Sequence, residues 1–196
     1  MISDGAMELI RSGAVDNTKK AFLAGRTVTS FLVGSKELYD FVDDNPGLHC
    51  DEATVTNSPI TIARNDKVVA INSALEVDLT GQVCADSVGT KMISGVGGQL
   101  DFERGAALSK GGFPIICLPS LSSKKKQSTI VNTLRPGAGV TTSRYHAHWI
   151  VTEYGAVNLW GKDLIQRARA MISIAHPSQR EALSQAAFER FKVLIQ

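Results

Sequence analysis

The chain has 196 residues, of which 43% are hydrophobic and 20% are charged, and 21 Lys and Arg against 19 Asp and Glu give a formal charge of +2. This composition is ordinary for a globular α/β protein with a sizeable core, and the near balance of charge gives no reason to expect nucleic acid or a membrane as a partner. No apolar run approaches the roughly 20 residues that span a bilayer.

Cysteine usage and the start of the chain indicate the compartment. The three cysteines form no CxxC pair and no zinc pattern, so reduced thiols are expected. The start MISDG lacks the basic and apolar regions of a signal peptide. These features predict a cytoplasmic protein.

The elements expected in the first half of the chain are two helices and a strand. A helix is predicted over 4–12, with Asp4 as its cap and Gly13 as its end. The apolar and β-branched run 27–33 predicts a buried strand. Ser35 then caps a helix that ends at 45–47.

The second half alternates strands with helices, which predicts a layered α/β fold in one domain. The predicted strands are 68–71, a hairpin over 76–85 that turns at Thr80–Gly81, and the runs 115–118, 129–134 and 149–152. Three helices are predicted. The first follows the glycine cluster 95–98 and ends at 111–112, and the other two cover 162–175 and 178–194.

Glu76 and Asp78 share one face of the predicted hairpin, because side chains alternate along a strand. No Lys or Arg occurs between Lys67 and Lys91, so no cation is close in sequence. A carboxylate in a dry, apolar site is poorly solvated and is a stronger nucleophile toward a carbonyl carbon. A solvated edge strand is the alternative for Glu76, and Asp78 is expected to bond the backbone at the turn.

Several sequence blocks resemble the C-terminal domain of the acetyl-CoA hydrolase/transferase family. They are Ser3–Gly5, SALEVDLTGQV, SGVGGQLDFERGA, TEYGAVNLWGK, and the His176–Pro177 pair with Arg180. The resemblance runs in order over residues 1–196. It implies a layered CoA-transferase-like (NagB/RpiA-like) domain with a central mixed sheet flanked by helices.

The resemblance implies a CoA-transferase with Glu76 as its nucleophile. Glu76 would attack the acyl-CoA carbonyl to give an acyl anhydride, and CoA thiolate would then form a glutamyl-CoA thioester. An incoming short-chain carboxylate reverses these steps. Acyl-CoA is then a substrate, and no permanently bound cofactor is expected. An acyl-CoA hydrolase of the same fold and a non-catalytic CoA-binding fragment are the alternatives.

The resemblance also assigns the residues around Glu76. The backbone N–H groups of Gly155 and Val55 are the expected oxyanion donors. The expected contacts with CoA or substrate come from three segments, and they are Thr56, Asn57, Gly95, Gly97, Gly98 and Val151. Each glycine could also be an ordinary turn, and a dinucleotide fingerprint fails because residue 100 is Leu.

His146 and His148 alternate in the sequence and could share one side of a strand, as metal ligands do. Glu153 is the one other possible metal ligand nearby in the sequence. We therefore expect both histidines to pack in the fold or face solvent, and no metal site is expected.

Family members are about twice as long as this chain, with an N-terminal domain that the chain lacks. The resemblance therefore implies an N-terminal domain or subunit as a partner, and assembly into a homo-oligomer.

Overall fold

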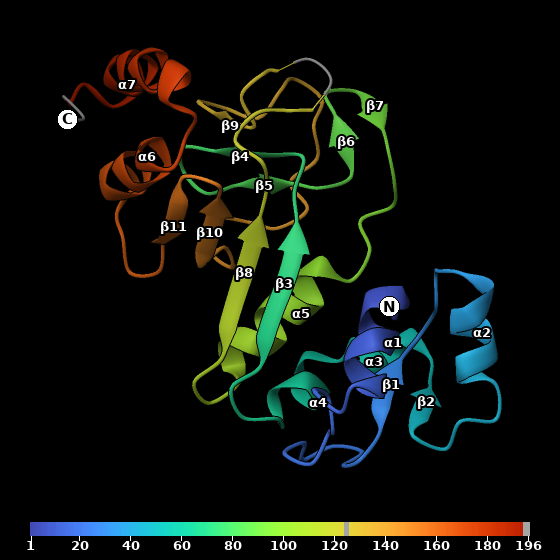
Figure 1. Cartoon of the computed structure of the whole chain (residues 1–196). Coiled ribbons are helices and arrows are strands. Elements are labelled where there is room, and N and C mark those ends of the chain that lie inside the picture. Colours follow the sequence, from blue (N-terminus) through green and yellow to red (C-terminus); the bar gives the residue numbers. More distant parts are fainter. Residues whose placement is uncertain (124–125, 194–196) are drawn as a thin grey trace.

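The main sheet of the protein has four strands. A computed structural model describes residues 1–123 and 126–193, and in these the strand order is β11-β10-β8-β3 (Figure 1). The bounds are Val69–Ser73 (β3), Phe113–Cys117 (β8), Trp149–Thr152 (β10) and Gly155–Asn158 (β11). The first three run parallel, and β11 turns back antiparallel to β10.

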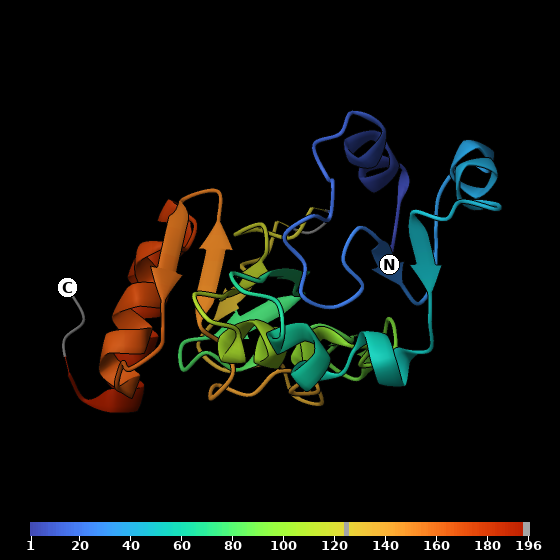
Figure 2. The ribbon, with the colours of Figure 1, turned by 90° about the horizontal axis from the view of Figure 1, so that it is seen from below.

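Helices lie behind this sheet and at one end of it. α5 (Gln99–Leu108) lies behind β3 and β8, and α6 (Leu164–Ser173) and α7 (Pro177–Phe191) lie beyond β11 (Figures 1 and 2). α6 begins at a capping box between Asp163 and Gln166, which satisfies backbone N–H groups of its first turn. The predicted α/β fold, with a central mixed sheet flanked by helices, is confirmed. Every helix in the described ranges is too short or too polar to cross a bilayer.

A second, smaller sheet carries the predicted hairpin. Its strands, in the order β5-β4-β9, are Val83–Cys84, Glu76–Asp78 and Ile130–Val131. The Asp78 carboxylate accepts hydrogen bonds from the backbone N–H groups of Thr80 (2.8 Å) and Gln82 (3.0 Å). Gly81 has a φ of +90°, which glycine adopts without strain. The predicted role of Asp78 at the turn is confirmed. The short antiparallel pair β6 (Ser87–Val88) and β7 (Lys91–Met92) follows.

The N-terminal residues form a layer with a small core of their own. The elements are α1 (Asp4–Arg11), β1 (Thr27–Thr29), α2 (Lys36–Val42), β2 (Leu48–Cys50), α3 (Ala53–Thr56) and α4 (Pro59–Ala63). β1 and β2 pair in parallel, and the core contains Ile2, Met7 and Leu38. α4 packs closely on α5, because a Cβ atom at Gly105 would lie 2.6 Å from the Ile62 side chain.

The main core lies between the two sheets and the C-terminal helices. Its fully buried members include Val77 and Ile130 from the small sheet, Ile116 and Ile150 from the main sheet, and Met171 from α6. Full burial of such a side chain stabilises the fold by about 1.5–3 kcal/mol. The two sheets and α6 therefore depend on one another for stability.

Some predicted boundaries are wrong. The strand predicted over 27–33 ends at Thr29, and Leu32 forms only an isolated bridge with Ile2. Ser3, not Asp4, is the N-cap of α1, and the Asp4 carboxylate instead accepts hydrogen bonds from the N–H and hydroxyl groups of Ser35. α7 ends at Phe191, and residue 194 of the predicted helix lies outside the described ranges.

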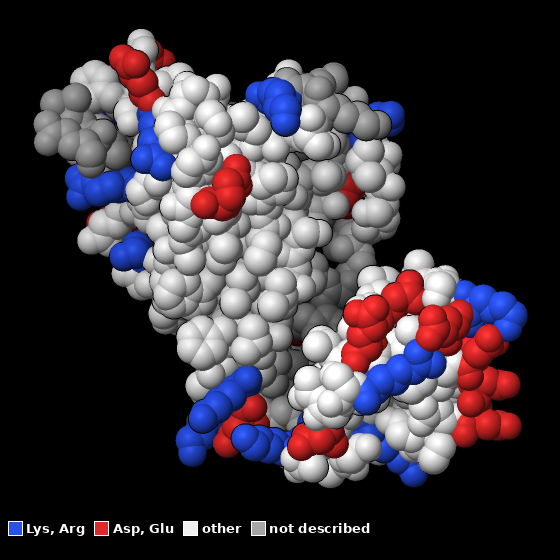
Figure 3. Space-filling view, viewed as in Figure 1, with Lys and Arg blue, Asp and Glu red and all other residues white. Residues whose placement is uncertain are grey.

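The front face of the main sheet is apolar and open. The register places three rows of side chains on it, which are Val69, Ile71, Phe113, Ile115, Cys117, Trp149 and Val151 with the one polar residue Ser73. Ile71 is 69% exposed. In Figure 3 the surface over these strands is mostly white, while acidic side chains gather on the N-terminal layer. Contiguous apolar surface of this kind is typical of an interaction site.

A carboxyl group is buried between α5 and the sheet. Oε1 of Glu103 accepts a hydrogen bond from Nδ2 of Asn72 at 2.8 Å, and Oε2 has no partner among the described residues. Burial raises the pKa of Glu103 to about 7, and the bond from Asn72 opposes this rise. Burial of the Cys117 thiol raises its pKa, and the nearby Glu103 charge raises it further.

We expect Glu103→Gln to flatten the pH dependence of stability. Because the pKa rises on folding, the folded chain holds an extra proton between about pH 5 and pH 7, and the free energy of unfolding falls as the pH rises through this range. The fall should be on the order of 2–3 kcal/mol, since one pKa unit is worth about 1.4 kcal/mol. Urea denaturation at several pH values measures it. Glu181→Gln on the surface of α7 is the matched control, and an unchanged slope in Glu103→Gln would contradict the assignment.

Candidate active site

A pocket of about 260 Å³ lies between the N-terminal layer, α4 and the free edge of β3. We call it the Asn57 pocket, and it is lined by Met1, Lys20, Phe22, Val28, Thr29, Ser30, Thr56, Asn57, Thr61, Ile62, Asn65, Val68, Val69, Ala70 and Phe102. Its walls combine apolar side chains with a few hydroxyl and amide groups. That mixture is typical of small-molecule sites, in which a few polar groups fix the orientation of a mostly buried ligand.

Asn57 is held at the wall of this pocket by its neighbours. It follows the last residue of α3, and its Oδ1 accepts a hydrogen bond from the Thr56 hydroxyl at 3.0 Å. The Nδ2 atom lies against Gly98, where an added Cβ atom would be only 2.3 Å away. Gly98 must therefore be glycine for Asn57 to keep this place. The side-chain amide is a hydrogen-bond donor next to the start of α5.

The glycine segment 95–98 leads directly into α5, with Gly98 as its N-cap. Gly95 and Gly97 are exposed, and an added Cβ atom at either would meet no other atom within 4 Å. Gly97 has a φ of +66°, so a side chain there would strain the backbone. The first N–H groups of a helix are unpaired and carry a partial positive charge. Together with Asn57 they could stabilise an anionic group of a ligand.

The predicted residues Gly155 and Val151 lie elsewhere, at the carboxyl end of β10. A shallow pocket there is lined by Cys117, Leu118, Pro119, Val151, Thr152 and Glu153, and it shares no residue with the Asn57 pocket. Gly155 begins β11 with a φ of +140°, a conformation that favours glycine. Both oxygens of the Glu153 carboxylate accept hydrogen bonds from Ser120, which lower its pKa.

The backbone N–H of Val55, a predicted oxyanion donor, donates to the carbonyl oxygen of Glu52 at 3.1 Å. It is therefore engaged in the first turn of α3. Its role as an oxyanion donor stays a prediction, and it requires this bond to open.

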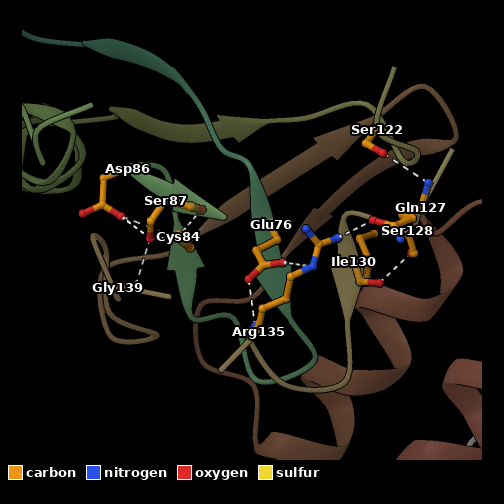
Figure 4. A network of polar contacts seen from close by, with 10 residues as sticks. All are labelled: Glu76, Cys84, Asp86, Ser87, Ser122, Gln127, Ser128, Ile130, Arg135 and Gly139. Carbon is orange, nitrogen blue, oxygen red and sulfur yellow. Dashed lines mark hydrogen bonds and ion pairs between the residues drawn. The ribbon is translucent and has the colours of Figure 1, made fainter. Parts of the chain in front are cut away.

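Glu76 lies in the small sheet, where Figure 4 shows it beside Arg135. Its side chain is only 2% exposed. Its Oε1 accepts a hydrogen bond from the backbone N–H of Arg135 at 2.9 Å, and its Oε2 lies 3.4 Å from Nε of the same residue. No cation is close to Glu76 in the sequence, but the fold brings Arg135, which is 59 residues away in the chain, beside it. The role of Glu76 as the nucleophile is a prediction that these contacts do not favour.

The predicted site residues thus lie in three places. Thr56 and Asn57 line one pocket, with Gly98 against Asn57. Val151 and Gly155 lie at the carboxyl end of β10 and the start of β11, and Glu76 lies in the small sheet. Sequence reasoning missed Lys20, whose Nζ donates to the Arg26 carbonyl oxygen at 2.6 Å and whose pKa is lowered by burial. Lys20 lies in a segment without periodic pattern, so no signal identified it.

His146 and His148 both line a second, larger pocket. Within residues 1–123 and 126–193, no group of three or more His, Cys, Asp or Glu side chains is arranged to hold a metal ion.

Comparison with known proteins gives one consistent result. Residues 34–187 match the family model of the acetyl-CoA hydrolase/transferase C-terminal domain. The 4-hydroxybutyrate coenzyme A transferase of Clostridium kluyveri is 52% identical over 191 residues, which cover 97% of this chain and 44% of that protein. The succinyl-CoA:acetate/propanoyl-CoA:succinate CoA transferase of Fasciola hepatica is 52% identical over 197 residues, covering 99% of this chain and 41% of that protein.

A more distant relative and a solved structure point to the same family. The acetyl-CoA hydrolase of Kluyveromyces lactis is 27% identical over 187 residues, covering 94% of this chain and 34% of that protein. The crystal structure of RipA from Yersinia pestis superposes with a TM-score of 0.92 at 41% identity, covering 98% of this chain and 43% of that one. The chain thus spans less than half the length of the relatives it matches.

We expect Gly98→Ala to displace the side chain of Asn57. The new methyl group would lie 2.3 Å from Nδ2, which is the far end of a flexible side chain, so Asn57 should rotate away at a cost of about 0.5–1.5 kcal/mol. The side-chain amide signals of Asn57 in an NMR spectrum would report the displacement, and thermal unfolding would report the small loss of stability. Gly95→Ala is the matched control, because its methyl group meets open space. Unchanged Asn57 signals in Gly98→Ala would contradict the assigned packing.

Proposed function

The chain belongs to the acetyl-CoA hydrolase/transferase family, and from this we propose that it is the C-terminal catalytic part of a CoA-transferase. The reaction would exchange CoA between an acyl-CoA thioester and a short-chain carboxylate. One observation carries the choice of transferase. The relatives named as CoA transferases share up to 52% of their aligned residues with this chain, whereas the Kluyveromyces lactis acetyl-CoA hydrolase shares 27%.

We place the reacting end of acyl-CoA in the Asn57 pocket. The pocket combines apolar walls for an acyl chain with the Asn57 amide and the start of α5 for a developing negative charge. Donors that already point at the site stabilise an oxyanion without reorganisation. Gly95, Gly97 and Gly98 would let CoA approach the backbone closely, because their Cα atoms carry no side chain.

In this proposal a second domain or subunit completes the site. We propose that an N-terminal half packs on the open front face of the main sheet, since this face is apolar and exposed. Val69 lies on this face and also lines the Asn57 pocket, so a partner on the sheet would reach the pocket and exclude water from it. Water exclusion favours transfer over hydrolysis, because water competes with the acceptor acid. Assembly into a homo-oligomer stays a prediction.

The covalent route is a separate part of the proposal. A carboxylate attacks the acyl-CoA carbonyl and expels CoA thiolate, which leaves an acyl anhydride. The thiolate then attacks the glutamyl carbonyl and releases the acyl group as a free acid, which leaves a glutamyl-CoA thioester. An acceptor carboxylate reverses both steps. The family resemblance names Glu76 as this glutamate, and attack by Glu76 would require its contacts with Arg135 to open.

The contacts of Glu76 favour a second role for it. It joins β4 to the backbone at Arg135, the segment that follows β9, and so holds this segment against the hairpin. In that role the covalent glutamate would be another residue of the complete enzyme. The two roles differ in where the thioester forms.

We expect CoA exchange from a chimera that joins this chain behind the N-terminal part of the Clostridium kluyveri relative. The chimera should transfer CoA from acetyl-CoA to butyrate, and the isolated chain should be at least about 100-fold slower, because removal of half of a closed site exposes the intermediates to water. Butyryl-CoA formation by chromatography measures transfer, and CoA release without butyrate measures hydrolysis. A folded chimera that releases CoA at the same rate with and without butyrate would favour the hydrolase. A folded chimera that shows neither transfer nor hydrolysis would overturn the proposal.

Borohydride trapping should locate the covalent glutamate. Borohydride reduces a glutamyl thioester to an alcohol, so the chimera incubated with acetyl-CoA should lose mass at one glutamate that peptide mapping can identify. Reduction at Glu76, abolished in Glu76→Gln, would establish it as the nucleophile. Reduction at another glutamate that persists in Glu76→Gln would assign Glu76 the structural role. Glu103→Gln, another buried acid, is the control that should leave the trapped site unchanged.

A further inference from the structure

A second cavity lies at the amino ends of β8 and β10, away from the Asn57 pocket. It has a volume of about 610 Å³ and shares no lining residue with the Asn57 pocket. Six of its lining residues carry aromatic or imidazole rings, and they are Phe113, Tyr145, His146, His148, Trp149 and Trp160. None of the residues that we assign to CoA exchange lines this cavity.

The rings of this aromatic pocket pack against one another and still leave surface free. The ring centroids of His148 and Trp160 are 4.3 Å apart, and those of Tyr145 and His146 are 4.8 Å apart. Tyr145 is nevertheless 66% exposed and Trp160 is 54% exposed. Mutual packing holds the rings in place, so they form a surface for stacking before any ligand binds.

The charge around the pocket is positive. Arg104 is its one charged lining residue apart from the histidines, and no Asp or Glu lines it. Arg104 has no ion-pair or hydrogen-bond partner among residues 1–123 and 126–193. Burial lowers the pKa of His146 and His148, and the nearby Arg104 lowers that of His146 further. These shifts favour the uncharged imidazoles, which leaves Arg104 as the one fixed cation among the lining residues.

We propose that the aromatic pocket binds a flat aromatic ligand that carries an anionic group. The ring of the ligand would stack on the aromatic side chains. Its anionic group would bind the guanidinium of Arg104, whose planar donors suit carboxylate and phosphate. An aryl carboxylate and a nucleotide share this chemistry. The proposal does not depend on CoA exchange.

The two tryptophans of the chain provide the test, because Trp149 and Trp160 both line the pocket. We would titrate the whole chain with benzoate and with adenosine 5′-monophosphate and follow tryptophan fluorescence. At least one of the two probes should change the fluorescence in a saturable way. The probe that binds more tightly shows whether the pocket prefers an aryl carboxylate or a nucleotide. Benzyl alcohol, adenosine and inorganic phosphate should each bind at least about tenfold more weakly, since each lacks the ring or the charge.

Two variants and one control make the test specific. Arg104→Gln should weaken binding of the anionic probe about tenfold or more, as expected for a lost charge-assisted hydrogen bond. Tyr145→Ala should also weaken it while leaving both tryptophans in place. Arg169→Gln, an exposed arginine on α6, should bind as the wild type does. No saturable change with either probe, or equal affinity in Arg104→Gln, would overturn the proposal.

Discussion

The side chain of Gln99 ties the two sheets together, and the Asn57 pocket depends on this tie. Nε2 donates to the carbonyl oxygen of Ser73 at the end of β3, at 2.7 Å, and Oε1 accepts from the hydroxyl of Thr142 at 2.9 Å. The backbone at Thr142 in turn accepts a hydrogen bond from the N–H of Val83 in β5. Loss of this amide would leave buried polar groups without partners, at about 1–3 kcal/mol each. It would also release the start of α5, and with it the close approach of Gly98 to Asn57.

The open sheet face and the Asn57 pocket are parts of one surface. Val69 belongs to both, because its side chain lies on the front of β3 while the strand edge borders the pocket. A partner that covers the exposed Val69 and Ile71 would therefore also narrow the pocket mouth. Burial of this apolar surface would drive association at about 25 cal/mol per Å² of area removed from water. Stability of the assembly and water exclusion from the site would then have the same physical origin.

Local sequence signals predicted local structure well and spatial partners poorly. Turn chemistry identified the Thr80–Gly81 hairpin, and apolar runs identified the strands of the main sheet, because both depend on neighbours in the chain. The strands β2 and β11 were missed, because their pairing with β1 and β10 decides them. Spatial neighbours in the candidate site were missed for the same reason. The sequence grouped Thr56 and Asn57, but nothing local indicates that Gly98 abuts Asn57 or that Arg135 reaches Glu76.

A buried acid with a cation beside it reacts differently from a buried acid alone. Desolvation makes an isolated carboxylate a strong nucleophile, but Arg135 compensates the charge of Glu76 in this fold. Removing the partner of a fully buried charge costs about 3–5 kcal/mol, and the cost here is smaller because the Arg135 side chain is 34% exposed. Each 1.4 kcal/mol of that cost, added to an activation barrier, slows a reaction about tenfold. Attack by Glu76 therefore needs a substrate or partner group that replaces Arg135 at the same moment, whereas binding in the Asn57 pocket breaks no buried pair.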